Sequence, residues 1–237
     1  DSIHIDPWKK YQDFIVGLDW TLKMIEYCDN INNNIFFEIG TEEAIRPFSS
    51  EEITIMLQFL KDKLDSKVFE RILFCVIQSG TALQNGENIG NYNNHKLKDM
   101  IKIVSKFNIK SKEHNGDFMS DEIMQDRFKN KLSAINIAPE LGILETKIIL
   151  ENIPENSKEF NDIYNICYKS NKWKKWVNDS FDPILNRRQL IEICGHYIFS
   201  NEEFKKIKYT IDNIDNIIQN KLYNYLLNKY NTATKFI

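Results

Sequence analysis

Histidine and carboxylate side chains recur at the ends of short apolar segments in the first part of the chain. His4 and Asp6 lie two positions apart in the first segment, Glu38 and Glu42 keep one parity in the second, and His114 ends a later one. Two imidazoles with two or three carboxylates can bind a divalent ion that polarises a sugar carbonyl, while a remaining carboxylate moves a proton. These residue types therefore predict a metal-assisted site.

Motifs that the sequence lacks disfavour other kinds of catalytic site. There is no GxSxG nucleophile elbow and no GxxxxGK[ST] phosphate loop, and no cysteine has an evident histidine partner. Covalent acyl transfer and nucleotide hydrolysis are therefore disfavoured. Lys112 is a candidate for Schiff-base chemistry, but we interpret it as a surface residue.

Two glycine-bearing loops are candidates for a phosphate site, because backbone N–H groups can bind an anion. One contains Gln78, Ser79 and Gly80 together with residues 85–90, and the other runs from residue 139 to Gly142 at the start of a predicted helix. Glycines are common at turns between strands and helices, so neither loop is a specific motif.

The elements that must position these residues follow a repeating pattern. Short segments rich in β-branched and aromatic residues alternate with longer segments of helical period, which is typical of a parallel sheet with crossover helices. The predicted strands span residues 2–6, 34–41, 71–79, 109–115 and 133–138. The predicted helices span residues 8–30, 49–66, 94–107, 119–131 and 142–151. Ser49 and Ser120, each followed by acidic residues, predict helix starts.

One face of each predicted strand becomes polar towards its carboxyl end, since side chains alternate between the two faces of a strand. Parallel barrels and doubly wound sheets place their active sites at that end of the sheet. A lone histidine is more often a hydrogen-bonded structural residue than a ligand, but recurrence at five strand ends favours a common site. We therefore expect these polar residues to converge.

The strand pattern ends near residue 153, and a segment rich in Lys, Asn, Tyr and Leu at helical spacing follows. We predict an α/β barrel region at residues 1–153 and an all-helical extension at residues 154–237. The Trp- and Tyr-rich tail is also consistent with a helical interaction module fused to a degenerate barrel, although an aromatic stripe is usually core.

Composition narrows the class of protein. The chain has 237 residues, 42% of them hydrophobic, which suffices for a sizeable core, and its net charge of -3 disfavours a nucleic-acid partner. No apolar run approaches the ~20 residues needed to cross a bilayer. The four cysteines form no CxxC pair, so we interpret them as reduced, mostly buried thiols of a cytoplasmic protein. No membrane partner is expected.

Several sequence blocks together resemble the non-catalytic subunit family of D-tagatose-bisphosphate aldolase. They are HID at 4–6, FEIGTEEA at 37–44, VIQSGT at 76–81, KEHNGDF at 112–118 and INIAPELGILET at 135–146. The resemblance implies a TIM-type barrel whose fourth to eighth strands are the five predicted here, so that the first three βα units have no counterpart. A separate segment or a second copy of the chain would then complete the barrel, and we expect an oligomer.

The resemblance also implies site residues. It matches polar positions of the family at His4, Asp6, Glu42, Gln78, Glu113, His114, Asp117, Asn136 and Glu140, and less securely at Glu38 and Lys112. We predict that a divalent metal ion is bound by His4, Asp6, Glu42 and His114. Catalytic proton transfer is assigned to Glu113, Glu140 and Asp117. Substrate binding is assigned to Gln78, Ser79, Gly80, Asn136 and Gly142.

Two functions remain open. The first is an enzyme with epimerase or aldolase-type chemistry on a ketose phosphate of the tagatose or fructose type, because some relatives epimerise hexulose phosphates with a divalent metal. The second is a non-catalytic accessory subunit that stabilises a class II tagatose-bisphosphate aldolase, the role described for other family members. The first hypothesis names a phosphorylated sugar as the ligand of the barrel, and the second names an aldolase as the partner of the chain.

Overall fold

A five-stranded parallel sheet is the centre of the first part of the molecule. The computed structural model describes residues 1–235. The strands are neighbours in the order β1, β2, β3, β6 and β7. Their bounds are β1 Ser2–Ile5, β2 Phe36–Ile39, β3 Ile72–Val76, β6 Lys110–Glu113 and β7 Ala134–Ile135. Strands of this sheet that follow one another along the chain are therefore neighbours in the sheet.

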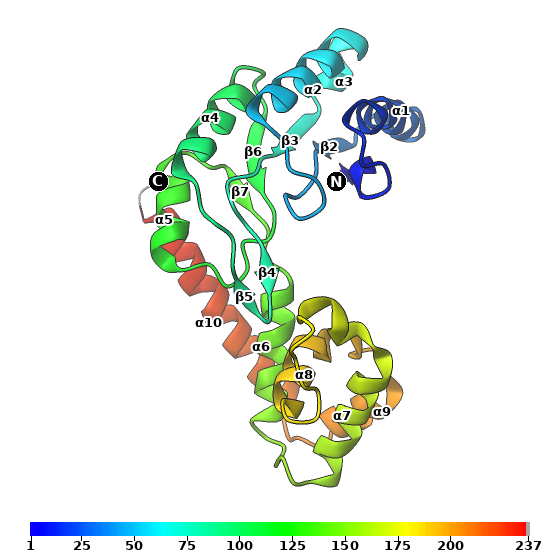
Figure 1. Cartoon of the computed structure of the whole chain (residues 1–237), viewed down its shortest axis with the longest axis vertical. Coiled ribbons are helices and arrows are strands. Elements are labelled where there is room, and N and C mark those ends of the chain that lie inside the picture. Colours follow the sequence, from blue (N-terminus) through cyan, green and yellow to red (C-terminus); the bar gives the residue numbers. More distant parts are fainter. Residues whose placement is uncertain (236–237) are drawn as a thin grey trace.

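Helices connect the strands and cover one face of this sheet. They are α1 Phe14–Ile31, α2 Ser50–Lys63, α3 Ser66–Phe69, α4 Asn94–Ser105 and α5 Asp121–Lys129. Figure 1 shows α1, α2 and α4 arranged along the sheet. This alternation is the βα repeat of parallel barrels, and the predicted barrel-type α/β fold class is confirmed.

The two faces of the sheet have different surroundings. Ile5, Phe37, Ile39 and Cys75 point towards the helices and are fully buried in the first hydrophobic core. The other face bears polar and aromatic residues, among them Phe36, which is 43% exposed. The polar face therefore carries the side chains available for chemistry.

Several boundaries differ from the sequence expectation. The predicted helix at 8–30 is a 3-10 turn at Pro7–Lys9 followed by α1, and the predicted helix at 49–66 ends at Lys63 before the separate helix α3. Helix starts were predicted more accurately, because Ser49 forms a capping box with Glu52 and Ser120 accepts from the N–H of Ile123.

A short antiparallel hairpin was not predicted. It comprises β4 Leu83–Gln84 and β5 Glu87–Asn88 within the loop after β3. Asn85 and Gly86 at its tip have positive φ angles of 53° and 77°. An Asn-Gly pair is a strong signal for this type of turn, so the sequence did contain the necessary information.

Helices alone form the last part of the described chain. They are α6 Pro139–Leu150, α7 Lys158–Ser170, η2 Lys172–Trp176, α8 Arg187–Cys194, η3 Gly195–Tyr197, α9 Glu202–Lys208 and α10 Ile214–Thr234. Residues of α6 to α10 form a second hydrophobic core, so this core begins before residue 154. The predicted division at residue 153 stays a prediction.

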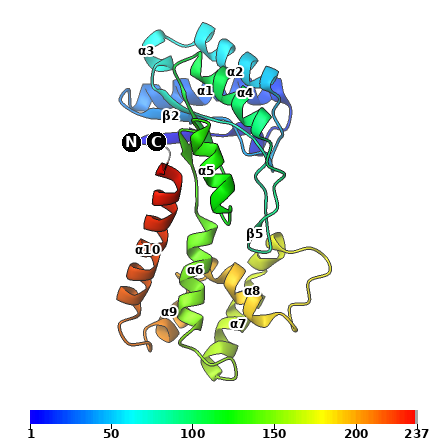
Figure 2. The same ribbon diagram turned by 90° about the vertical axis from the view of Figure 1, so that its left-hand side faces the viewer.

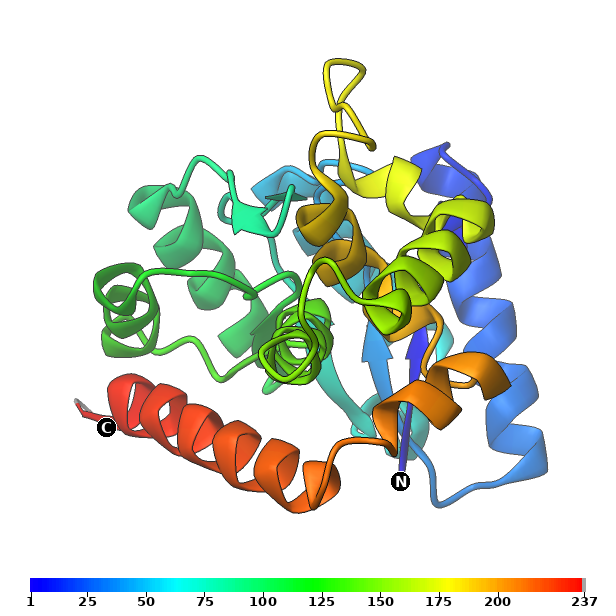
Figure 3. The same ribbon diagram turned by 90° about the horizontal axis from the view of Figure 1, so that it is seen from below.

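The last helix returns from the helical region towards the sheet. Figure 2 shows α10 running alongside α6, and Figure 3 shows α6 along its axis with α10 beside it. Tyr225 of α10 donates a hydrogen bond to Glu140 of α6, and Lys229 donates one to the carbonyl of Met119 before α5. Within residues 1–235 no helix combines the length and the hydropathy that a membrane span requires.

The helical region contains a histidine whose protonation is expected to destabilise it. Burial, with a contribution from the positive charge of Lys175, lowers the pKa of His196 to about 4. The unfolded chain then binds the proton more readily than the folded chain, so the contribution of His196 to stability is lost as pH falls from about 6.5 towards about 4. We expect His196→Gln to show a smaller fall in Tm over this range in thermal melts.

A matched control is available for this experiment. The side chain of His95 is 87% exposed, so His95→Gln should retain the acid sensitivity of the parent protein. Equal acid sensitivity in both variants would contradict the expectation for His196.

Candidate functional site

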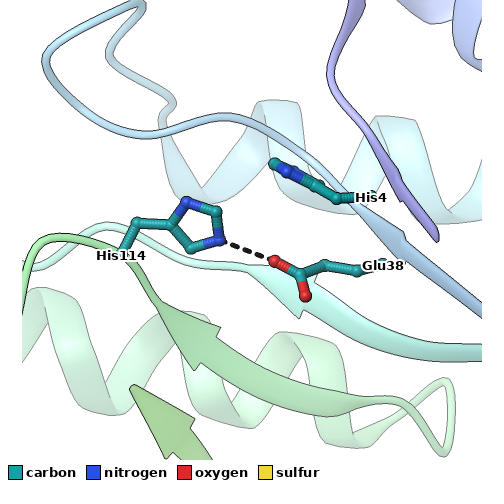
Figure 4. A group of neighbouring side chains, drawn as sticks. All are labelled: His4, Glu38 and His114. Carbon is teal, nitrogen blue, oxygen red and sulfur yellow. Dashed lines mark hydrogen bonds and ion pairs between the residues drawn. The ribbon is translucent and has the colours of Figure 1, made fainter. Parts of the chain in front are cut away.

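Two histidines and one glutamate from three strands meet on the polar face of the sheet. His4 belongs to β1, Glu38 to β2, and His114 follows β6 directly. Each offers one ligand atom, and these atoms lie within 4.8 Å of one another. Figure 4 shows the His114 ring pointing at the Glu38 carboxylate, with His4 beside both. The site therefore lies at the carboxyl ends of the strands, as expected.

The strand register explains why these side chains meet. His4 lies directly opposite Glu38 in the parallel pair of β1 and β2. β3 separates β2 from β6, and Phe74 stands opposite Glu38 there. His114 and Lys112 share one face because they are two residues apart, so both reach across β3 to Glu38.

Glu38 is the centre of the hydrogen bonding in this group. Its Oε1 lies 2.6 Å from His114 Nε2, and its Oε2 accepts from Lys112 Nζ at 2.5 Å. Burial opposes ionisation of Glu38, but these two hydrogen bonds outweigh burial and lower its pKa to about 2. Glu38 is therefore a carboxylate over the physiological pH range.

The histidines are held in different ways. His4 is exposed, and its Nε2 donates to the carbonyl of Gly40 at 3.0 Å, which leaves its Nδ1 as an available acceptor. The two imidazole rings are 4.9 Å apart between centroids, in an edge-to-face arrangement. Both rings thus lie beside the same carboxylate.

Two further carboxylates, Asp6 and Glu42, flank this group. Asp6 Oδ2 accepts from the hydroxyl of Thr41 at 3.0 Å, and its Oδ1 is buried without a hydrogen-bond partner. Burial raises the pKa of Asp6, although the hydrogen bond from Thr41 and the charge of His4 act in the other direction. Glu42 accepts from the side chain of Asn115 at 2.5 Å. Neither belongs to the three-residue group.

Glu113, predicted as a catalytic base, lies on the opposite face of β6. Its side chain is fully buried, and its Oε2 accepts from Arg127 Nε at 2.5 Å. Its Oε1 accepts from the backbone N–H and the hydroxyl of Ser79. These contacts occupy both carboxylate oxygens away from the polar face and are structural, and the catalytic role of Glu113 stays a prediction.

Several N–H groups of the two glycine loops are already donated to carboxylates of the protein. The Ser79 N–H is donated to Glu113, and the Gly80 N–H is donated to Glu43 Oε2 at 2.9 Å. Around the second loop, the N–H groups of Ala138 and Glu140 are both donated to Asp117 Oδ1 at 2.8 Å. Carboxylates of the protein thus occupy the positions expected for an anionic ligand.

The remaining predicted site residues serve mainly structural contacts. Asp117 is 1% exposed and caps α6, while Glu140 accepts from Tyr225. Gln78 is 1% exposed and bonds to the backbone of Thr41, Arg46 and Phe48, which fixes the loop after β2.

Two predicted substrate-binding residues differ in their surroundings. Gly142 packs closely against His196, because a Cβ atom there would lie 2.6 Å from the Cβ atom of His196. Asn136 is exposed just after β7. Only Asn136 of this pair has a side chain open to a ligand.

The structure brings His4 and His114 together, as expected, and adds Glu38 as the third residue of the group. The assignment of Asp6 and Glu42 as metal ligands stays a prediction. The signal was present in the sequence, because Glu38 shares the strand parity of Glu42 and is nearer the middle of the strand. A residue within a strand is held by the register, whereas Glu42 lies beyond the end of β2.

The donor set fits a divalent metal ion. Two imidazole nitrogens and one carboxylate oxygen are ligands that zinc and related ions accept, and three protein ligands leave coordination positions open for a substrate. Lys112 supplies a hydrogen bond behind the carboxylate, as partners of metal ligands commonly do. A bound ion there would polarise a carbonyl or hydroxyl oxygen of a substrate.

Comparison with known proteins shows the fold. No family model and no curated protein matches the sequence. A crystal structure of a probable tagatose 6 phosphate kinase from Sinorhizobium meliloti 1021 matches with a TM-score of 0.67 at 11% identity, over 87% of this chain and 58% of that chain. A fructuronate-tagaturonate epimerase from Cohnella laeviribosi matches with a TM-score of 0.70 at 12% identity, over 93% of this chain and 51% of that chain.

The chain thus spans about half the length of the solved structures it matches. At these identities the likeness establishes the barrel-type fold. Membership of the specific accessory-subunit family stays a prediction.

Proposed function

We propose that the chain carries a metal-assisted site of carbohydrate metabolism, with epimerase or aldolase-type chemistry on a ketose phosphate of the tagatose or fructose type. The observation that supports this most strongly is the grouping of His4, Glu38 and His114 at the carboxyl ends of three parallel strands. In this proposal the three residues hold a divalent ion. A divalent ion held there would supply a Lewis acid for the ketose oxygen of the substrate.

The proton transfer needs a group beside the metal that is not itself a ligand. Glu113, Asp117 and Glu140 are engaged in structural hydrogen bonds. Asp6 lies close enough to His4 for the two charges to interact, and its Oδ1 has no hydrogen-bond partner. We assign the role of proton acceptor to Asp6 on this geometry.

The proposed substrate class rests on the chemistry of the site and on the names of the matched structures. Those names refer to tagatose phosphate and to the sugar acids fructuronate and tagaturonate. A metal ion with imidazole and carboxylate neighbours suits a ligand rich in hydroxyl groups. The phosphate of such a ligand would lie away from the N–H groups of Ser79, Gly80 and Ala138, which are already donated to carboxylates.

The proposed activity can be tested directly. The purified protein is incubated with Zn²⁺, Mn²⁺ or Mg²⁺ and a panel of hexulose monophosphates and bisphosphates, and the products are followed by NMR. We expect conversion of at least one sugar by the parent protein and none by His114→Ala. An unchanged panel with every metal would contradict the enzymatic proposal.

An accessory role is the second candidate, and a different surface favours it. α1 exposes the apolar side chains of Trp20, Tyr27 and Ile31, which are 38%, 68% and 69% exposed. This surface lies at the β1 side of the sheet, where a protein partner such as a class II aldolase would have access (Figure 1). Co-purification with that aldolase and a gain in its stability would support the role. His114→Ala should leave such a gain intact.

A further inference from the structure

Lys112 places a positive charge beside the candidate metal site. Its Nζ lies 2.5 Å from Glu38 Oε2, and the side chains of Lys112 and Glu38 are 15% and 8% exposed. The ammonium also lies 5.3 Å from the centroid of the Phe74 ring. Lys112 is therefore a largely buried cation fixed against the one carboxylate of the group.

The negative charge of Glu38 consequently interacts with two donors, one on each carboxylate oxygen. His114 occupies Oε1 at 2.6 Å and Lys112 occupies Oε2, so both oxygens have donors in the absence of a metal. A divalent ion at Oε1 would lie only about 5 Å from the ammonium, where like charges repel strongly at the low effective dielectric of a partly buried site. The hydrogen bond orients the carboxylate, but the positive charge opposes a second cation.

These two effects of Lys112 have opposite signs, and their magnitudes decide between them. Loss of an orienting partner commonly costs about 10–100-fold in metal affinity. The backbone of Glu38, however, is fixed within the sheet between β1 and β3. Because the sheet itself orients this residue, we expect the charge repulsion to be the larger effect.

We propose that Lys112 is an internal cation that competes with the metal for Glu38 and so sets the metal affinity of the site. This inference rests on the proposed metal site. In the metal-free protein Lys112 neutralises the buried carboxylate. When the metal binds, the ammonium gives up part of its contact with Glu38 and becomes available to an oxygen of the substrate beside the metal. Lys112 thus couples the binding of the metal to the binding of the substrate at this site.

Removing the charge tests this inference. Lys112→Met keeps an unbranched apolar side chain, one heavy atom shorter, but removes the ammonium. We expect it to bind Zn²⁺ at least about tenfold more tightly than the parent protein in isothermal titration calorimetry, because the like-charge repulsion is gone. The metal-free variant should be less stable, since Glu38 loses its counter-charge, and Zn²⁺ should raise its Tm more than that of the parent.

Controls separate this inference from the metal site itself. Lys110→Met, on the same strand and with an exposed side chain, should bind Zn²⁺ like the parent. Lys112→Gln provides a second neutral variant if Lys112→Met does not fold. If the parent binds Zn²⁺ and both neutral variants bind it equally well or more weakly, the proposed competition between Lys112 and the metal is overturned. Absence of binding by the parent and by the variants would instead overturn the proposed metal site.

Discussion

Arg127→Met is expected to lower the free energy of unfolding by about 3–5 kcal/mol, because it leaves a buried carboxylate without its counter-charge. Arg127 and Glu113 are both 0% exposed, and Arg127 Nε lies 2.5 Å from Glu113 Oε2. The guanidinium also donates to the carbonyl of Gly80 and lies 4.1 Å from the centroid of the Tyr92 ring. Its loss would loosen β6, α5 and the loop after β3 together. Chemical denaturation measures the change.

Two controls make this result interpretable. In the double variant Arg127→Met with Glu113→Leu, no charge remains buried, and we expect much of the stability to return. Arg188→Met removes a more exposed arginine, 38% exposed, that pairs with Glu192, and it should cost no more than about 1 kcal/mol. If Arg127→Met were as mild as Arg188→Met, the structural role given to Glu113 would be contradicted.

His114→Ala is expected to weaken the binding of Zn²⁺ by more than about 100-fold, since even the loss of a group that only supports a ligand costs about 10–100-fold. The variant removes one of three ligand side chains and leaves the contact between Glu38 and Lys112 in place. Calorimetry with Zn²⁺ measures the change. The backbone around residue 114 follows a paired strand, so the fold should be retained.

His95→Ala is the matched control for this prediction. His95 is exposed on α4 and contacts Asp99 at 3.1 Å, so it resembles His114 in pairing with a carboxylate but lies outside the group. Its replacement should leave Zn²⁺ affinity unchanged. Equal losses in the two variants would show that Zn²⁺ binds elsewhere on the protein.

The fold was predictable from sequence because two periodicities alternate along the chain. Each of the five predicted strands exists, but β7 is reduced to Ala134–Ile135 from a prediction of six residues. β7 is an edge strand, and the residue types in an edge strand do not show where its hydrogen bonds to the neighbouring strand stop. The helix α6 begins at Pro139, earlier than predicted, because Pro suits the first turn and Asp117 accepts from the N–H groups there.

The candidate site was predictable only in part. Parity placed His4 and His114 on one surface, but it could not separate Glu38 from Glu42, which have the same parity. Parity also could not show that the predicted bases would pair with distant partners. Glu113 meets Arg127 and Glu140 meets Tyr225, and both contacts depend on helix packing that local sequence does not specify.

The loops illustrate the same limit for anion binding. Glycines after β3 and near α6 are compatible with a phosphate site, but whether their N–H groups are free depends on which carboxylates approach them. Here Glu113, Glu43 and Asp117 do so from elsewhere in the chain. A sequence pattern can therefore predict a turn more reliably than it predicts the ligand of that turn.

The central claim is that His4, Glu38 and His114 hold a divalent metal ion. The most direct measurement is an anomalous difference map from crystals of the protein grown with Zn²⁺. The account predicts a peak at about 2.0–2.2 Å from an imidazole nitrogen of His4, an imidazole nitrogen of His114 and an oxygen of Glu38. A map with no peak at this position, or with its peak between Asp6 and Glu42 instead, would contradict it.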